Sequence, residues 1–388
     1  MSTEEAVAAG GVIAPAQALS GGSDDGDLVL AAQAALRNGN PEQAAALYGM
    51  ALEGLHPGHT RYAALLGLAG AQCDAGRLDL AECTCRSAVG ESPAIHTGHA
   101  MLASVLLDLG RLDEAAEAVQ AALRRSQRDP QLLNLATGIA LRRGRAAEAR
   151  DLAQRCLAQS HADQRALAHL AIALAQLGCD RDVAWLLDFG KLLKVTMAGT
   201  PAGFASTRAF NRTLVDSLVN RPDLSYRHTA RTMVGGARLN DSFVLDPLVA
   251  EPLRRIFTDA VASYLADLEV GSDHPFLAGK PEAMVVTSWA NIMDEGAFEL
   301  PHMHEGAWLS GVYYPEVTTP SSTADDAGAI EFGGHDFNDV LPFTGPTRRI
   351  VPVPGMLVLF PSYFYHRTIP FAGRGRRISI AYDASPAR

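Results

Sequence analysis

Two closely spaced histidines lie in the stretch ELPHMHEGAWLSGVYYPEV, residues 299–317. On an extended chain, residues i and i+2 point to the same face, so the imidazoles of His302 and His304 can reach one point. Imidazole is a common ligand of zinc, copper, iron and nickel in proteins. A further histidine, His366, ends the segment FPSYFYH. The spacing therefore lets His302 and His304 share a metal ion, and His366 is a further candidate residue.

A second candidate group is the arginine of the segment GRGRRISIAY, whose residue types are typical of a strand. In such a strand Arg377 and Ser379 share one face, and Ile378, Ile380 and Tyr382 share the other. The isoleucines fit packing on the outside of a barrel, so we expect Arg377 to point inward. A buried arginine favours an anionic partner that it can bind through two hydrogen bonds, such as a carboxylate.

The order of these motifs resembles that of the 2-oxoglutarate- and iron(II)-dependent oxygenases, and most of all their prolyl-hydroxylase-like branch. The resemblance covers residues 205–388. Within that branch it is similar to a bacterial group whose motifs read here, in chain order, as Trp289, Asn291, Gly296, His302 and His304, Ser310 to Tyr314, Phe360 to Ser362, His366, and Arg377 to Ser379.

The resemblance implies a double-stranded β-helix, or jelly-roll, fold and roles for several residues. His302 and His366 would be iron(II) ligands. Arg377 and Tyr314 would bind the distal carboxylate of the co-substrate 2-oxoglutarate. Asn291 would reach the co-substrate or the substrate from the preceding strand.

His304 departs from the family's usual H-x-D or H-x-E motif, in which a carboxylate completes a site of two histidines and one acid. Three interpretations are open at this point: His304 replaces the carboxylate, Glu305 supplies it, or water takes the third position. We expect the three-histidine site, because the side chain of Glu305 starts on the opposite face of the extended segment.

The first half of the chain repeats at a nearly fixed period. Turn glycines recur at intervals of 37, 34, 34 and 34 residues, at Gly39, Gly76, Gly110, Gly144 and Gly178. Between them the apolar residues have helical spacing, and small residues recur at the fifth and twelfth positions after each glycine. This period resembles that of tetratricopeptide repeats. Such repeats stack into a solenoid with a concave groove, which implies recognition of a peptide or protein.

The second half is rich in strands. A helix is predicted over residues 246–268, and Val-, Ile- and aromatic-rich runs predict strands within 282–293, 307–317, 328–334, 347–362 and 376–383. We therefore expect an α + β multidomain chain, an α-solenoid followed by a jelly-roll domain. The expected divisions are a flexible arm over residues 1–24, the repeat domain over 25–195, a linker over 196–206 and the oxygenase domain over 207–388.

Composition excludes several classes of protein. The formal net charge of −10 argues against a nucleic-acid-binding protein, which usually carries a basic face. No run of 18 apolar residues predicts a membrane span, and the N-terminus has no basic region typical of a signal peptide. The five cysteines form no CxxC pair and are expected to be small apolar residues in a reducing compartment, the cytoplasm.

Together with the repeats, the resemblance implies a hydroxylase that uses iron(II), 2-oxoglutarate and O2 on a protein or peptide side chain recruited by the repeats. Three alternatives stand beside this hypothesis. The chain is a small-molecule oxygenase whose repeats serve oligomerisation, a scaffold with a catalytically silent barrel, or an enzyme similar to three-histidine thiol dioxygenases, which use no 2-oxoglutarate. Arg377 and Tyr314 weigh against the thiol dioxygenase, because they suit the distal carboxylate of a keto acid.

Overall fold

The computed structural model describes residues 24–224, 232–268, 273–317, 326–371 and 375–387. The expected arm over residues 1–24 lies outside these ranges except for Asp24, where the first described helix begins. The chain forms two compact units that divide between Gln159 and Ser160. No helix in the described ranges combines the length and apolar character needed to cross a membrane.

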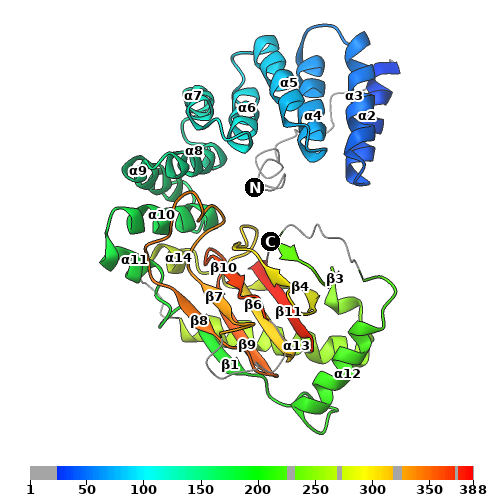
Figure 1. Ribbon diagram of the computed structural model, residues 1–388, viewed down its shortest axis with the longest axis vertical. Coiled ribbons are helices and arrows are strands. Elements are labelled where there is room, and N and C mark those ends of the chain that lie inside the picture. The colour runs from blue at the N-terminus through cyan, green and yellow to red at the C-terminus, as the bar shows by residue number, and fades with distance from the viewer. Residues whose placement is uncertain (1–23, 225–231, 269–272, 318–325, 372–374, 388) are drawn as a thin grey trace. The chain divides into compact units, whose positions relative to one another are not determined.

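The N-terminal unit is a stack of helical pairs, coloured blue to teal in Figure 1. Gly39, Gly76, Gly110 and Gly144 all adopt a positive φ between paired helices, from 68° to 74°, where glycine is the favoured residue. The pairs are α2 (Asp24–Arg37) with α3 (Pro41–Gly54), α4 (His59–Asp74) with α5 (Leu78–Glu91), α6 (His96–Asp108) with α7 (Leu112–Leu123), and α8 (Pro130–Arg142) with α9 (Ala146–Leu157).

The small residues predicted in phase with the glycines are fully buried in the four pairs of this unit, whereas Gly190, in phase with Gly178, is exposed. A larger side chain at these positions would push neighbouring helices apart. The positions that repeat in the sequence are therefore the positions at which neighbouring helices make close contact. The positions with no exposed surface are Ala44, Ala81, Ala115 and Ala149 in one set, and Ala51, Ala88, Ala122 and Cys156 in the other.

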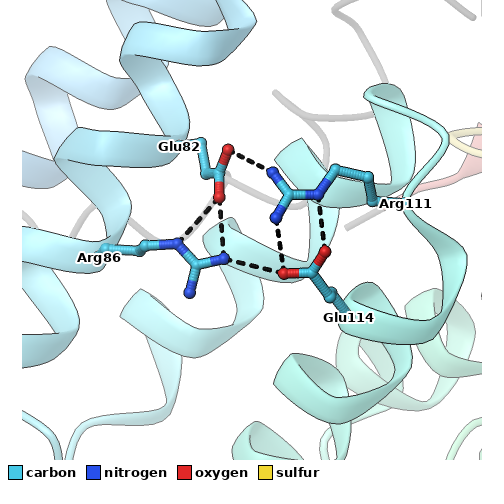
Figure 2. A network of polar contacts seen from close by, with 4 residues as sticks. All are labelled: Glu82, Arg86, Arg111 and Glu114. Carbon is cyan, nitrogen blue, oxygen red and sulfur yellow. Dashed lines mark hydrogen bonds and ion pairs between the residues drawn. The ribbon is translucent and has the colours of Figure 1, made fainter.

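An ion-pair network links two successive pairs of this stack on its surface (Figure 2). Arg111, just before α7, donates to Glu82 of α5 and to Glu114 of α7, each at 2.6 Å. Arg86 of α5 pairs with Glu82 at 2.8 Å and with Glu114 at 3.1 Å. Exposed pairs contribute little individually, about 0–1 kcal/mol, so burial of the small residues, and not this network, holds the stack together.

The C-terminal unit begins with a helical pair that still follows the repeat period. Helices α10 (Gln164–Gln176) and α11 (Asp180–Leu186) flank Gly178, which has a φ of 68°. Their contacts belong to the strand-rich unit, where the backbone N–H of Tyr363 donates to Gln164 Oε1 at 3.0 Å. The compact units thus divide at 159/160, before the expected end of the repeats at residue 195.

Three sheets make up the strand-rich part, shown largely in yellow to red in Figure 1. A six-stranded sheet has the order β1-β9-β6-β11-β4-β3, a three-stranded sheet the order β10-β7-β8, and β2 pairs with β5. The strands are β1 (Lys194–Met197), β2 (Met233–Val234), β3 (Ala237–Leu239), β4 (Met284–Met293), β5 (Phe298–Glu299), β6 (Leu309–Glu316), β7 (Ile330–Phe332), β8 (Arg348–Ile350), β9 (Met356–Pro361), β10 (His366–Thr368) and β11 (Arg377–Pro386).

Helix α13 (Pro247–Asp267) packs against the outer face of the large sheet, where Phe257 stacks on Tyr382 with ring centroids 4.1 Å apart. On the other face, Phe360 of β9 meets Phe332 of β7 at 4.8 Å, so the small sheet faces the large one. Two packed sheets agree with the expected β-rich fold, and its closure as a jelly roll stays a prediction. Helices α12 (Thr207–Val219) and α14 (Pro275–Ala278) complete the unit with the short 3-10 turn Ser242–Val244.

The main elements predicted from sequence are present. The predicted helix over 246–268 is α13. The first four predicted strand regions contain β4, β6, β7, and β8 with β9, and the fifth contains the start of β11, which continues to Pro386. The expected linker over 196–206 needs correction at its start, because Thr196 and Met197 belong to β1 and pair with β9. The short strands β1, β2, β3, β5 and β10 were not predicted.

Candidate metal centre

The three predicted histidines come from two segments that are paired by backbone hydrogen bonds. His302 and His304 follow β5, and His366 opens β10. The backbone N–H of His302 donates to the carbonyl of His366 at 3.0 Å, and the reverse bond is 2.9 Å. One nitrogen from each imidazole belongs to a group whose members all lie within 4.8 Å of one another, so the group could hold a metal ion.

Hydrogen bonds fix the orientation of each ring. Nδ1 of His302 lies 2.8 Å from the carbonyl oxygen of Leu300, and Nδ1 of His366 lies 3.0 Å from that of Phe364. Because a carbonyl oxygen only accepts, both Nδ1 atoms carry the proton and both Nε2 atoms keep a lone pair. This is the tautomer that a metal-binding histidine needs.

His304 is held by a carboxylate instead of a carbonyl. Its Nδ1 donates to Oδ1 of Asp383 on β11 at 2.7 Å, and its buried Nε2 has no hydrogen-bond partner among the described residues. The hydroxyl of Ser310 donates to the same Asp383 oxygen at 2.7 Å. An unpaired buried nitrogen costs free energy unless a ligand satisfies it, so the donor set fits a bound metal ion.

Burial favours neutral imidazoles at two of the three positions. Burial lowers the pKa of His366 well below its usual value, and the charges of the other two histidines lower it further. Burial also lowers the pKa of His302. Burial by itself would lower the pKa of His304 as well, but the charge and hydrogen bond of Asp383 outweigh it and the pKa is raised.

Glu305, the other residue considered as a ligand, points elsewhere. Its carboxylate pairs with Arg165 of α10, and its side chain is 41% exposed. The described metal-ligand group contains His304 and not Glu305. The structure thus brings together the H-x-H pair and His366, as expected for a three-histidine site.

Arg377 lies on the inner face with no counter-charge. It is 3% exposed, and its Nε donates to the carbonyl of Gly328 at 3.2 Å. Its Nη2 lies 3.4 Å from the hydroxyl of Tyr314. No carboxylate in the described ranges forms an ion pair with it. Burial raises the pKa of Tyr314 to about 12, so the phenol stays protonated and can donate to an anion beside Arg377.

Asn291 and Trp289 also lie on β4 near this group. Asn291 is 1% exposed and faces Ser379 across the β4–β11 pair. Its Nδ2 donates to Oε1 of Glu299 at 3.0 Å. The Trp289 ring stacks against the His304 imidazole with centroids 5.5 Å apart. Trp289 therefore forms a wall of the metal centre.

Comparison with known families decides which proteins this arrangement belongs with. Residues 287–383 match a family model described as "Putative 2OG-Fe(II) oxygenase". Residues 29–94 and 100–163 match a tetratricopeptide repeat model. The chain thus carries a tetratricopeptide repeat region followed by a segment that matches a putative 2OG-Fe(II) oxygenase family. Every histidine of the cluster, and Asp383 with it, lies inside the matched oxygenase segment.

Solved structures are similar to about two fifths of the chain. MamA 41-end from Desulfovibrio magneticus RS-1 is 14% identical, covers 43% of this chain and 93% of that one, and has a TM-score of 0.40. A tetratricopeptide repeat protein from Parabacteroides merdae is 18% identical. The match covers 43% of this chain and 66% of that one, with a TM-score of 0.41. With TM-scores this low, the assignment rests on the family models. No curated protein matches the chain.

Three polar residues of the oxygenase domain were missed from sequence. Asp383 is two positions beyond Ala381 on the inward face of β11, so the alternation that placed Arg377 could have found it. Glu299 lies on the two-residue strand β5. Arg238 lies on β3 directly opposite Asn291. Neither short strand has a recognisable period, so the sequence carries little signal for these two residues.

Proposed function

We propose that the chain is an iron(II)- and 2-oxoglutarate-dependent hydroxylase that acts on a protein or peptide side chain recruited by its repeats. The observation that carries the proposal is the convergence of three imidazoles, each with Nδ1 held by an acceptor, on the same inner face as Arg377. His302, His304 and His366 are the proposed iron ligands. When bound, iron(II) with 2-oxoglutarate supplies the oxidising power for hydroxylation by O2, with succinate and carbon dioxide as co-products.

The residues of the chain bind and orient the co-substrate. Arg377 provides a buried positive charge for the distal carboxylate of 2-oxoglutarate, and Tyr314 donates its phenolic proton to the same group. Three neutral imidazoles leave the double positive charge of iron(II) uncompensated, so an anionic keto acid is attracted more strongly than in a site with a carboxylate ligand. Asp383 restores part of the balance through His304.

The repeats support a polypeptide substrate by analogy. Tetratricopeptide repeats generally bind peptides or proteins on their concave face. A partner held there would be delivered to the oxygenase domain of the same chain, which raises its local concentration. A small-molecule oxygenase with oligomerising repeats is the alternative, and the two differ in whether free metabolites are turned over.

One observation favours a second candidate. The three-histidine set is also the ligand set of thiol dioxygenases, which need no keto acid. Arg377 and Tyr314 favour the 2-oxoglutarate enzyme, because a buried cation beside a protonated phenol fits a carboxylate.

The test is consumption of 2-oxoglutarate by the iron(II)-loaded protein, followed as succinate formed without added substrate. We expect slow succinate formation by wild type. In Arg377→Met we expect an apparent affinity for 2-oxoglutarate about 10–100-fold weaker, because the variant loses charge-assisted hydrogen bonds whose free energy corresponds to about that factor. The exposed Arg376→Met is the matched control and should behave as wild type. Absence of 2-oxoglutarate binding to iron-loaded wild type would contradict the proposal.

A further inference from the structure

A second arginine lies beside the metal centre and has no assigned role. Arg238 of β3 is directly opposite Asn291 of β4, and Asn291 is opposite Ser379 of β11. Residues directly opposite in neighbouring strands point to the same face of the sheet. Arg238 therefore extends over the inner face that also carries Arg377 and the histidine cluster.

Arg238 lies close to the cluster. Its guanidinium carbon is 4.9 Å from the centre of the Trp289 ring, and that ring stacks on His304. Burial is the largest influence on the pKa of both His302 and His304, and the charge of Arg238 is a smaller one that opposes protonation of each ring. A ligand held by Arg238 would thus lie next to the proposed iron ligands.

Arg238 and Asn291 each present an unused hydrogen-bonding atom. Within the part of the chain that the structure describes, the buried Nε of Arg238 has no acceptor and the buried Oδ1 of Asn291 has no donor. Glu299 fixes which way the Asn291 amide points, because its carboxylate accepts from Nδ2 at 3.0 Å and would repel Oδ1. The pair therefore offers one fixed donor and one fixed acceptor.

Bulk water does not satisfy these unpaired atoms, because both are buried. Asn291 is 1% exposed, and Arg238 is only partly exposed. Burial lowers the pKa of Arg238, while the carboxylates of Glu299 and Asp383 act in the opposite direction. No carboxylate in the described part of the chain pairs with its guanidinium. Both groups would gain from a ligand that satisfies them.

We propose that Arg238 and Asn291 form a substrate subsite that binds an amide group. The amide carbonyl accepts from Arg238, and the amide N–H donates to Oδ1 of Asn291. Opposite residues on paired strands have Cβ atoms about 5 Å apart, so both side chains can reach one planar amide. Trp289 provides an apolar surface beneath it.

A carboxylate fits this subsite less well than an amide. It would bring two acceptor oxygens against Oδ1 of Asn291, which is also an acceptor. It would also meet the negative charge of Glu299, which already acts on Arg238. The donor–acceptor pair thus selects for an amide, as in a peptide bond or a carboxamide side chain. This inference rests on the proposed function only in calling the amide part of the substrate.

Binding of small probes to the full-length protein tests the subsite. The probes are butyramide for a carboxamide, N-methylacetamide for a peptide amide, and butyrate for a carboxylate, each followed by saturation-transfer NMR in the weak affinity range of such small ligands. We expect saturation of one or both amides that depends on Arg238, and saturation of butyrate that does not, because Arg377 is the proposed carboxylate site. The amide that binds better tells whether a carboxamide or a peptide bond is the natural group.

The variants are Arg238→Met and Asn291→Asp. Each should weaken amide binding about tenfold, because each removes one good hydrogen bond or, in Asn291→Asp, engages Arg238 in an ion pair. Arg254→Met is the matched control, because Arg254 also stacks on a ring, that of Phe243 at 4.0 Å, and lies on α13 outside the sheet. It should bind the amides as wild type does.

Two outcomes would overturn the subsite. Butyrate binding more strongly than the amides, in a manner dependent on Arg238, would make it a carboxylate site. Folded Arg238→Met and Asn291→Asp proteins that bind amides like wild type, or wild type that binds none, would leave both residues with a purely structural role. Because the probes need no turnover, failure of 2-oxoglutarate consumption would reject the proposed function and leave the amide result standing.

Discussion

The carboxylate of Asp383 lies one residue further from the proposed metal position than the carboxylate of the usual oxygenase motif. It forms a hydrogen bond to the ligand His304 and is not itself a ligand. In the usual motif a carboxylate binds the metal directly. Here His304 stands at that position, and the carboxylate of Asp383 accepts from its Nδ1 at 2.7 Å. A hydrogen-bonded carboxylate orients the ring and makes the opposite nitrogen a better donor to metal. Ser310 holds Asp383 in turn.

At this scale we predict that Asp383→Asn weakens metal binding about 10–100-fold. Asparagine keeps the size of the side chain and an accepting oxygen for His304, so the loss reports the charge and the ring's donor strength. Anaerobic titration with cobalt(II), followed by its visible absorption, measures the affinity. The exposed Asp339→Asn should match wild type. An unchanged affinity in Asp383→Asn would show that His304 does not depend on this carboxylate.

The residues that belong to motifs could be predicted from the sequence. The H-x-H spacing and the alternation of β11 are enough to place His302, His304 and Arg377 in one candidate site. Arg238 and Glu299 lie on strands of three and two residues, where the contact depends on strand register alone. Register is set by tertiary packing, which a single sequence does not display.

Among the elements, β6 shows how closely the outer face of the large sheet is packed. Gly311 lies in the middle of this strand opposite Tyr382 of β11. A Cβ built on Gly311 would overlap the ring of Tyr382, which is fully buried and stacked on Phe257. The glycine is thus required by the position of an aromatic ring, and not by its backbone angles.

We therefore predict that Gly311→Ala destabilises the C-terminal unit by about 1–3 kcal/mol through overpacking. Gly306→Ala is the control, because a Cβ there meets nothing within 4 Å. Denaturant unfolding followed by tryptophan fluorescence reports on this unit, since Trp185, Trp289 and Trp308 are the only tryptophans of the chain. Equal midpoints for the two variants would refute this packing.

The long elements could be predicted and the short ones could not. The 21-residue helix α13 and the ten-residue strands β4 and β11 have clear apolar patterns. The four missed strands other than β1 have two or three residues each, too few to show an alternation. β1 was missed because its residues are mostly exposed and lack the expected apolar face.

On the scale of the whole chain, the sequence period and the packing units differ. Helices α10 and α11 continue the 34-residue period, yet they pack within the C-terminal unit that also contains the strands. Thr344 Oγ1 donates to the carbonyl of Ala175 at 2.9 Å, and Tyr363 donates through its backbone N–H to Gln164 and through its hydroxyl to Leu186. The pattern of a repeat does not encode which neighbour its last helices contact.

We predict that a protein beginning at Ser160 folds, whereas one beginning at Thr196, just after the expected end of the repeats, does not. The longer deletion removes α10, α11 and half of β1, and leaves the Tyr363 hydroxyl buried without its acceptor. Circular dichroism during thermal unfolding compares the two. A cooperative transition of equal midpoint in both proteins would show that these helices do not support the oxygenase unit.

The central claim is that His302, His304 and His366 together hold iron(II) beside bound 2-oxoglutarate. The most direct measurement is the visible metal-to-ligand charge-transfer band of the anaerobic iron(II) protein on addition of 2-oxoglutarate, in wild type, His304→Ala and Glu305→Ala. The account predicts a band in wild type and Glu305→Ala, and its loss or displacement in His304→Ala, because Glu305 pairs with Arg165 away from the cluster. Iron-bound wild type without a band, or an unchanged band in His304→Ala, would contradict it.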